Sequence, residues 1–373
     1  MPPVPADQSS STASTAVDDE FPIPTHSDVS SGIASQPNFN HTKQPKPDSM
    51  SSALPLSMGA FRILLALLAL IVALVAAVSL SAAPPACTPL DQPNPIANDY
   101  PYNATGLLNV TLAVIPIPLS LARTLIPPQW PILAHVYQAL FAALGVSEEV
   151  FPPDHYPLMV QAGLDHDIQV AAYKLSISDF QRAGYEFPFV DRLGDNHSSF
   201  RWVPHQIITA SNADAVEGSR AYGTLVSPSE SFDPPCDAYR WLGQYGGTTN
   251  FKAYARNNTS IRLSFYHTYF SPPALPLDLF RNMTNQPSFA NGTACDNQIR
   301  LFNTAHFFGT GNANLAAHPV RGSVTSANFA PLHGMHTWGG NVHGWQLATP
   351  FIENNYLDCD DFKGYDGVDL PGY

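Results

Sequence analysis

The sequence predicts an α+β protein that is mostly β, with a barrel or sandwich of short strands, a few helices and a single transmembrane helix in front. Three observations support this prediction. The 373 residues include 36 prolines, about double the usual share, and a proline inside a helix removes a hydrogen bond and clashes with the preceding turn. One uncharged apolar run is long enough to cross a bilayer. The segments after it are short, β-branched and separated by Pro- and Gly-rich turns.

Charge excludes one class of partner. The chain carries 17 Lys and Arg against 30 Asp and Glu, which gives a net charge of −13. Nucleic-acid binding needs clustered cations that neutralise phosphates, and no run of five basic residues occurs in the sequence. We therefore expect no nucleic-acid partner.

The chain divides into four predicted parts. Residues 1–60 are rich in Ser, Pro, Thr and Asp and bury too little apolar surface to offset the entropy of ordering, which predicts a disordered cytoplasmic tail. Residues 61–83 contain the run Ile63–Ala83, which is 21 residues long and uncharged, and they predict a transmembrane helix. Residues 84–100 form a Pro-rich stalk, and 101–373 form the folded domain.

The segment 61–83 is predicted to be an uncleaved signal anchor rather than a cleaved signal peptide. Its apolar stretch exceeds the usual 7–15 residues of a signal peptide, and a leader of 62 residues precedes it. Lys43, Lys46 and Arg62 lie before the span, and no Lys or Arg follows until Arg123. The positive-inside rule then gives a type II single-pass protein. Its span contacts the lipid bilayer, its N-terminus is cytoplasmic and its C-terminal domain is lumenal or extracellular.

Cysteines and glycosylation sequons agree with this placement. Four cysteines, an even number, follow the span; they are typical of disulfides in an oxidising compartment and allow three pairings. They are Cys87, Cys236, Cys295 and Cys359. Seven N-x-S/T sequons also follow the span, against one before it at Asn40, which predicts a glycoprotein. The seven begin at Asn103, Asn109, Asn196, Asn257, Asn258, Asn282 and Asn291.

The first elements of the folded domain are a strand and two helices. Leu107–Pro116 is β-branched and partly alternating, which predicts a strand. Ser120–Leu125 predicts a short helix that the following prolines stop. Ile132–Leu144 is amphipathic and ends at Gly145, as a helix does.

Strands are predicted to dominate the rest of the domain. The expected strands are Leu158–Gln161, Ile168–Ile177, Gln206–Ala210, Ala221–Val226, Asn250–Ala255 and Ile261–Phe270. The last alternates best, with Ile261, Leu263 and Phe265 on one face and Arg262 and Ser264 on the other.

Several common catalytic signatures are missing from the sequence. There is no G-x-S-x-G elbow, no phosphate-binding G-x-x-x-x-G-K-[ST] loop, no H-E-x-x-H and no G-x-G-x-x-G that opens a helix. We therefore expect no cofactor.

Histidines offer one alternative function. His333, His336 and His343 lie close together in 331–345, and neutral imidazoles at this spacing could bind zinc or copper in a metal-dependent hydrolase or oxidase. The other interpretation is that these Gly- and Trp-bearing loops use His as a surface hydrogen-bonding residue. A second small cluster is Asp165–Asp167, which contains His166.

Among the carboxylates, Glu186 is the candidate acid/base. Tyr185 and Phe187 flank it, and an apolar neighbourhood raises the pKa of a carboxyl group and suits proton transfer. The simpler interpretation is an ion pair with Arg182 or Arg192. A catalytic lysine is disfavoured, because the few lysines after the span have no adjacent cation that would lower their pKa.

Three segments, in order, resemble the acetoacetate decarboxylase superfamily. Leu121–Pro128 is similar to the early segment in which a short helix ends on a Leu-x-Pro turn. Gly184–Pro188 is similar to the Tyr-x-Glu strand, although the tyrosine here directly precedes Glu186. Gly218–Pro228 is similar to the Gly-Arg-Glu-x-x-Gly-x-Pro-Lys-Lys segment.

The chain departs from the superfamily at one decisive point. With the glycines aligned, the paired lysines of the superfamily fall on Val226 and Ser227, so the Schiff-base nucleophile and its activating cation are absent. The resemblance implies a β-rich cone or barrel around an apolar pocket, for a small keto-acid or apolar ligand. It implies either lysine-free lyase or decarboxylase-type chemistry or a pseudoenzyme.

The candidate site residues follow from this resemblance. Glu186 is the acid/base, and Arg182, Arg192 and Arg220 are the carboxylate partners through bidentate hydrogen bonds. Two alternatives stay open, the His-based metal enzyme and a structural or adhesion glycoprotein. The sequence leaves the oligomeric state undecided, a homo-oligomer included.

Overall fold

The computed structural model describes residues 93–242, 247–268, 271–302 and 317–365. The predicted tail, the predicted span 61–83, most of the predicted stalk and Cys87 lie outside the described residues. Within those described ranges, no helix has both the length and the apolar character that a membrane crossing requires.

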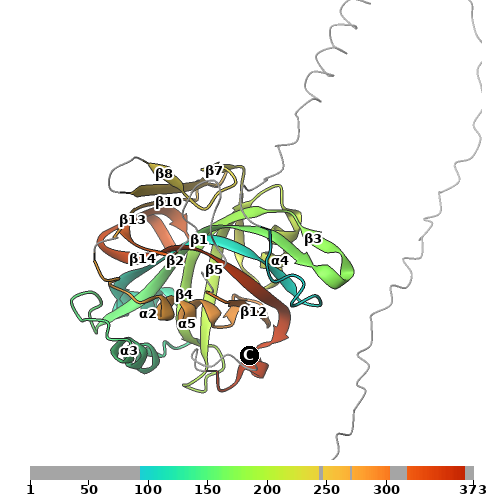
Figure 1. Ribbon diagram of the computed structural model, residues 1–373. Coiled ribbons are helices and arrows are strands. Elements are labelled where there is room, and N and C mark those ends of the chain that lie inside the picture. Colours follow the sequence, from blue (N-terminus) through green and yellow to red (C-terminus); the bar gives the residue numbers. More distant parts are fainter. Residues whose placement is uncertain (1–92, 243–246, 269–270, 303–316, 366–373) are drawn as a thin grey trace, which may run out of the picture. The chain divides into compact units, whose positions relative to one another are not determined.

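Seven strands close into a barrel in the order β1-β2-β4-β5-β11-β12-β14, because β14 pairs back with β1 (Figure 1). Each neighbouring pair is antiparallel except β5 and β11, which run parallel. The strands are β1 (Ala104–Pro118), β2 (His155–Val170), β4 (Phe180–Asp191), β5 (Ser199–Thr209), β11 (Ser288–Phe289), β12 (Ala294–Arg300) and β14 (Leu332–Asp358). Because β14 pairs with β1, neither end strand of this seven-stranded series is left unpaired, and the barrel has an interior.

The sheet continues beyond the barrel through β14, because the first half of this long strand extends past the barrel strands. This half pairs with β13 (His318–Phe329), and β10 (Ser260–His267), β9 (Thr248–Tyr254) and β7 (Ser231–Asp233) follow in order. Three short strands pair alongside: β3 (Leu175–Ile177) with β2, β6 (Leu225–Ser229) with β5, and β8 (Arg240–Leu242) with β9.

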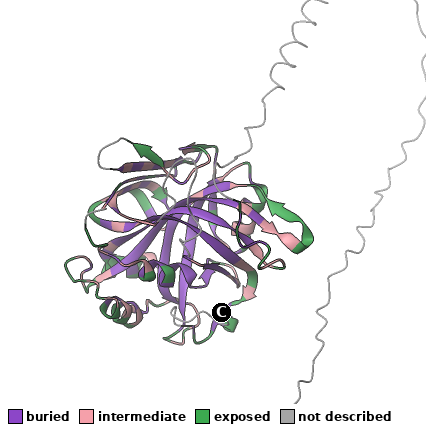
Figure 2. Ribbon diagram, viewed as in Figure 1, coloured by how far each residue is buried: buried purple, intermediate pink, exposed green. Residues whose placement is uncertain are grey.

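Helices are few and short. They are α2 (Leu119–Leu125), α3 (Ala134–Ala143), α4 (Ala213–Ala221) and α5 (Leu277–Asn285), with 3-10 turns at Ala171–Tyr173 and Cys359–Phe362. Helix α3 buries Tyr137 and Phe141, whose rings pack edge-on against Phe151 at 6.5 and 4.6 Å between centroids. The barrel strands other than β14 are buried along most of their length (Figure 2), and the apolar part of this burial stabilises them.

The structure confirms the first predicted strand and both predicted helices, with small shifts. Helix α3 begins at Ala134 rather than Ile132, because Ile132 forms a β-bridge with Val190 and the Leu133 N–H donates to the Phe189 carbonyl. The burial alternation predicted from Ile261 onward is also confirmed along β10. Phe270, the predicted end of that strand, lies outside the described residues.

Three predictions of secondary structure were wrong. The predicted strand Ile168–Ile177 is a hairpin, because a 3-10 turn and a left-handed Lys174 (φ 54°) reverse the chain. The predicted strand Ala221–Val226 starts only at Leu225, since Ala221 still belongs to α4. Residues 331–345 are not a loop: they form the first half of β14, where pairing with β13 outweighs the glycines.

The disulfides follow one of the three pairings allowed by the sequence. Cys295 and Cys359 are bonded to each other, which excludes the two pairings that join either of them to another cysteine. Cys236 is also disulfide-bonded.

Burial corrects two of the seven predicted glycosylation sites. Asn109 lies inside β1 and Asn282 inside α5, and both side chains are buried. A bulky glycan needs a surface position, so neither asparagine can carry one in this fold. Asn196, Asn257, Asn258 and Asn291 are exposed and Asn103 is half-buried.

Candidate functional site

A cavity of about 290 Å³ lies among β2, β4, β5, β12 and β14, with residues of α4 and β3 also lining it. Its polar wall holds three arginines and five carboxylate residues. The arginines are Arg182, Arg201 and Arg300, and the carboxylate residues are Asp165, Glu186, Asp214, Asp296 and Glu353. Charges of both signs around one small cavity that opens to the surface identify it as the candidate functional site.

Strand β12 supplies the central row of this wall. Asp296, Gln298 and Arg300 are two residues apart, so their side chains lie on one face of the strand at steps of about 7 Å. All three line the cavity. Strand β14 places Glu353 directly opposite Gln298.

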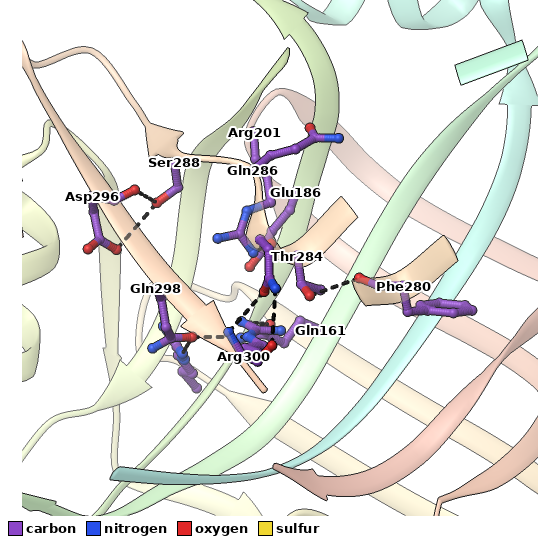
Figure 3. A network of polar contacts seen from close by, with 12 residues as sticks. Gln161, Glu186, Arg201, Phe280, Thr284, Gln286, Ser288, Asp296, Gln298 and Arg300 are labelled. Atoms are coloured by element: carbon purple, nitrogen blue, oxygen red, sulfur yellow. Dashed lines mark hydrogen bonds and ion pairs between the residues drawn. The ribbon is translucent and has the colours of Figure 1, made fainter. Parts of the chain in front are cut away.

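Gln298 contacts two cations and one acid of the wall, and Figure 3 shows its contact with Arg300. Its Oε1 accepts hydrogen bonds from Arg182 Nη2 at 3.1 Å and from Arg300 Nε at 3.0 Å. The Gln298 side chain also hydrogen-bonds the Glu353 carboxyl. The neutral amide therefore holds two arginines close together without neutralising either one.

Two of the arginines are already in ion pairs. Arg182 forms a two-point contact with Asp165, Nε to Oδ2 at 2.8 Å and Nη2 to Oδ1 at 2.9 Å. Arg201 Nη1 lies 2.7 Å from Glu186 Oε2, and both side chains are only 3% exposed. These pairs fix the positions of both carboxyl groups. Burial nevertheless raises the pKa of Asp165, against the opposing field of the Arg182 cation.

Arg300 differs from the other two arginines, because its hydrogen-bond partners are neutral. It is 1% exposed, and its Nη2 donates to Gln161 Oε1 at 2.7 Å. Among the described residues its Nη1 has no hydrogen-bond partner, and no carboxylate forms an ion pair with it. Burial, and then the nearby Arg201 cation, lowers the pKa of Arg300 to about 9, against the opposing field of the Glu186 carboxylate.

Asp296 and Glu353 form an acidic pair on neighbouring strands. Burial, and then the Asp296 charge, raises the pKa of Glu353 to about 8. Burial also raises the pKa of Asp296 to about 6, although the Arg201 and Arg182 cations oppose the shift. The two carboxyl groups therefore share about one proton at neutral pH, which makes a proton donor available inside the cavity.

The structure brings two of the four predicted catalytic residues together. Glu186 and Arg182 both line the cavity, but Glu186 pairs with Arg201, neither with Arg182 nor with Arg192. Arg192 and Arg220 are not among the residues that line the cavity. The Arg192 guanidinium stacks over the rings of Trp130 and Phe289 at 5.8 and 5.4 Å. Arg220 bonds Glu217 on the exposed side of α4.

Sequence reasoning missed Arg201, Arg300, Asp296 and Glu353. One signal was present, because Asp296, Gln298 and Arg300 alternate with Cys295, Asn297 and Ile299 in the sequence. A strand with one face made only of charged and long polar side chains indicates a polar wall rather than a core face.

The three histidines of the metal alternative do not form a metal site. His336 Nε2 lies 3.0 Å from the His333 carbonyl at an exposed position, whereas His343 lies seven residues further along β14, opposite Val114 of β1. Within the described ranges, no group of three or more His, Cys, Asp or Glu side chains could hold a metal ion. In the Asp165–Asp167 cluster, His166 Nδ1 lies 2.8 Å from Asp167 Oδ2 while Asp165 pairs with Arg182.

No lysine is among the residues that line the cavity. The positions that the superfamily resemblance gives to the paired lysines carry a buried Val226 and a Ser227 that lies 2.8 Å from His205 Nε2. Lys252 pairs with Asp233 at 3.3 Å. The described cavity therefore offers no amine for a Schiff base.

No protein-family model and no curated protein matches this chain. Its structure is similar to that of an acetoacetate decarboxylase-like enzyme from Sphingomonas wittichii RW1, with a TM-score of 0.38 and 6% identity over 69% of this chain and 92% of that one. It is also similar to the enduracididine biosynthesis enzyme MppR, complexed with the condensation product of pyruvate and imidazole 4-carboxaldehyde. There the TM-score is 0.38 and the identity 10%, over 74% of this chain and 100% of that one. At these scores neither likeness supports a conclusion about activity or ligand.

Proposed function

We propose that the barrel binds a small carboxylate, of the keto-acid class, in the cavity, with Arg300 as the anchor of the ligand carboxylate. The observation that carries this proposal is the Arg300 guanidinium, which is buried without an ion-pair partner among the described residues. A buried charge without a partner is costly, and a ligand carboxylate would supply the partner through charge-assisted hydrogen bonds. The charged wall disfavours the purely apolar ligand that the resemblance also allowed.

The acid/base group of this proposal is the pair Asp296 and Glu353, because it carries a proton at neutral pH. Glu186, the residue favoured from the sequence, keeps a positioning role, since its carboxylate is held by Arg201. A proton donor beside a bound keto acid would stabilise the enolate left when a bond next to the carbonyl breaks. Lysine-free lyase or decarboxylase-type chemistry is the reaction class that this arrangement supports.

A binding experiment with Arg300→Met tests the anchor. Methionine keeps much of the apolar stem and removes the charge, so we expect the affinity for pyruvate and propionate to fall by about tenfold or more. Calorimetric titration of the full chain measures the affinities, and Arg256→Met, at an 83% exposed arginine, is the matched control. Equal affinities of the two variants, or no binding of any carboxylate probe to the unaltered chain, would refute the proposal.

We also propose the type II membrane placement for the whole chain, supported by the charge flanks and by the disulfides. Expression in a eukaryotic cell should then give a glycoprotein whose mobility shifts on glycosidase treatment. Replacing Asn258 or Asn196, both exposed, with Gln should each remove one glycan. Replacing the buried Asn109 or Asn282 should remove none, and a glycan lost at Asn109 or no shift at all would contradict the expectation.

A further inference from the structure

The cavity wall is polarised along β12, with a cation at one end and acids at the other. Arg300 and Asp296 are four residues apart on the same strand face, and Gln298 lies between them (Figure 3). Glu353 lies opposite Gln298 on β14, which places its side chain diagonal to Arg300 across the strand pair, about 7–8 Å away between Cβ atoms.

At the acidic end, as at the Arg300 end, the protein leaves a polar atom without a hydrogen-bond partner. Among the described residues Asp296 Oδ1 has no hydrogen-bond partner, and Oδ2 receives only a long contact of 3.4 Å from Ser288 Oγ. The two nearest cations are occupied, because Arg182 is bonded to Asp165 and Arg201 to Glu186.

The groups that face the acidic pair come from several strands. Arg182 of β4, Arg201 of β5 and Arg300 of β12 favour its ionised form, and Asp165 of β2 opposes it. Asp214 of α4 also lines the cavity. Among the described residues, an Asp296 oxygen without a partner at one end and an Arg300 nitrogen without a partner at the other match a ligand with both charges.

We propose that the cavity takes a zwitterion, in which a short carbon chain joins a carboxylate to a protonated amine. The carboxylate lies at Arg300, and the amine lies between Asp296 and Glu353. This inference rests on the proposed function, because Arg300 anchors the carboxylate in both; with an amine bound, the acidic pair is its counter-ion and not a proton donor.

Proton release distinguishes a zwitterion from a simple acid. The free acidic pair holds about one proton at pH 7, and an ammonium group beside it favours the doubly ionised form. Binding of a zwitterion near pH 7 therefore releases a proton, and its affinity rises with pH up to about 8. A carboxylate without an amine adds negative charge to the cavity, so its binding releases no proton and weakens as the pH rises.

Three matched probes on the full chain test the inference: propionate with the carboxylate alone, propylamine with the amine alone, and β-alanine with both. The four-carbon series butyrate, butylamine and 4-aminobutyrate repeats the comparison at a longer charge separation. We expect at least one amino acid to bind about tenfold or more tightly than its matched acid at pH 8. We expect each amine to bind more weakly than its matched amino acid. Calorimetry at pH 7 in two buffers with different ionisation enthalpies measures the released proton on the unaltered chain.

Variants locate the amine. Glu353→Gln and Asp296→Asn should each reduce the preference for the amino acid over the matched acid by about tenfold, whereas Glu217→Gln, on the exposed side of α4, should keep the full preference. If the acids bind but neither amino acid binds more tightly or releases a proton, the zwitterion inference is overturned and the carboxylate site stands. If none of the acids or amino acids binds, the proposed function itself is overturned.

Discussion

Two polar clusters share strand β5 and differ in how many of their donors and acceptors find partners within the protein. The first is the cavity cluster, defined by the three arginines and by Asp165, Glu186, Asp296 and Glu353. The second is the His205 cluster, defined by His205, Ser227 and Asn257. In the His205 cluster Nδ1 accepts the Ala330 N–H at 2.9 Å, Nε2 lies 2.8 Å from Ser227 Oγ, and Asn257 Nδ2 donates to the same oxygen at 2.8 Å.

The difference separates a structural cluster from a ligand site. Because Nδ1 accepts a backbone hydrogen bond, the neutral His205 ring carries its proton on Nε2 and donates it to Ser227. That ring cannot remove a proton from the serine, so a His–Ser pair at hydrogen-bond distance is no catalytic dyad here. In the cavity cluster, by contrast, buried donors and acceptors of the described residues stay open beside an open volume. Buried polar groups are rarely left without partners in native proteins, so these groups support the proposed ligand site.

The largest expected effect compares a cavity ion pair with a surface pair of the same chemistry. Glu186→Ala leaves the Arg201 charge buried and unpaired, which should lower the free energy of unfolding by about 3–5 kcal/mol. Glu217→Ala breaks a pair of similar length, 2.6 Å, whose residues are 45% and 69% exposed, and should change stability little. Urea unfolding of both variants measures the contrast, and equal losses would show that the cavity pair is solvated.

The next largest effect is a fall in the free energy of unfolding as the pH rises, caused by the acidic pair Asp296 and Glu353. The pKa of Glu353 is raised from 4.5 to about 8 in the fold, so the folded chain keeps a proton that the unfolded chain has released between these values. Stability should therefore fall as the pH rises from about 5 to 8, by about 1–3 kcal/mol. Urea unfolding at several pH values should show a flatter profile for Glu353→Gln, and an unchanged slope would argue against a proton on this pair.

The smallest effect has the opposite sign and belongs to the His205 cluster. Burial lowers the pKa of His205 from 6.5 to about 4, so the unfolded chain binds a proton that the folded chain does not bind between these values. Stability should fall as the pH drops from about 6.5 to 4, and His205→Asn should reduce this loss by about 1–2 kcal/mol. The exposed His333 provides the control variant His333→Asn, which should lose as much stability in acid as the unaltered chain. His205→Asn should also leave the affinity for propionate unchanged. A loss of propionate binding in this variant would show that both clusters belong to one site.

Local patterns in the sequence were sufficient for several elements and for part of the site. β-branched alternation identified β1 and β10, proline and glycine stops bounded α2 and α3, and a glutamate between aromatic residues identified Glu186 as a cavity residue. These features are decided within a few neighbours, where propensity and periodicity act.

Long-range pairing decided the rest. The glycine- and histidine-rich segment 331–345 becomes a strand because β13 and β1 supply its hydrogen bonds, and a hairpin replaces the predicted strand at 168–177. Arg201 and Glu186 are 15 residues apart and meet across the paired strands β4 and β5. Arg300 and Gln161 are 139 residues apart on β12 and β2, which are not neighbours in the sheet, so only the barrel brings these two side chains together. The sequence by itself determined which residues could be charged, apolar or bridged. The tertiary structure alone decided which charges neutralise each other and which stay open to a ligand, because that depends on distances and burial that no local pattern encodes.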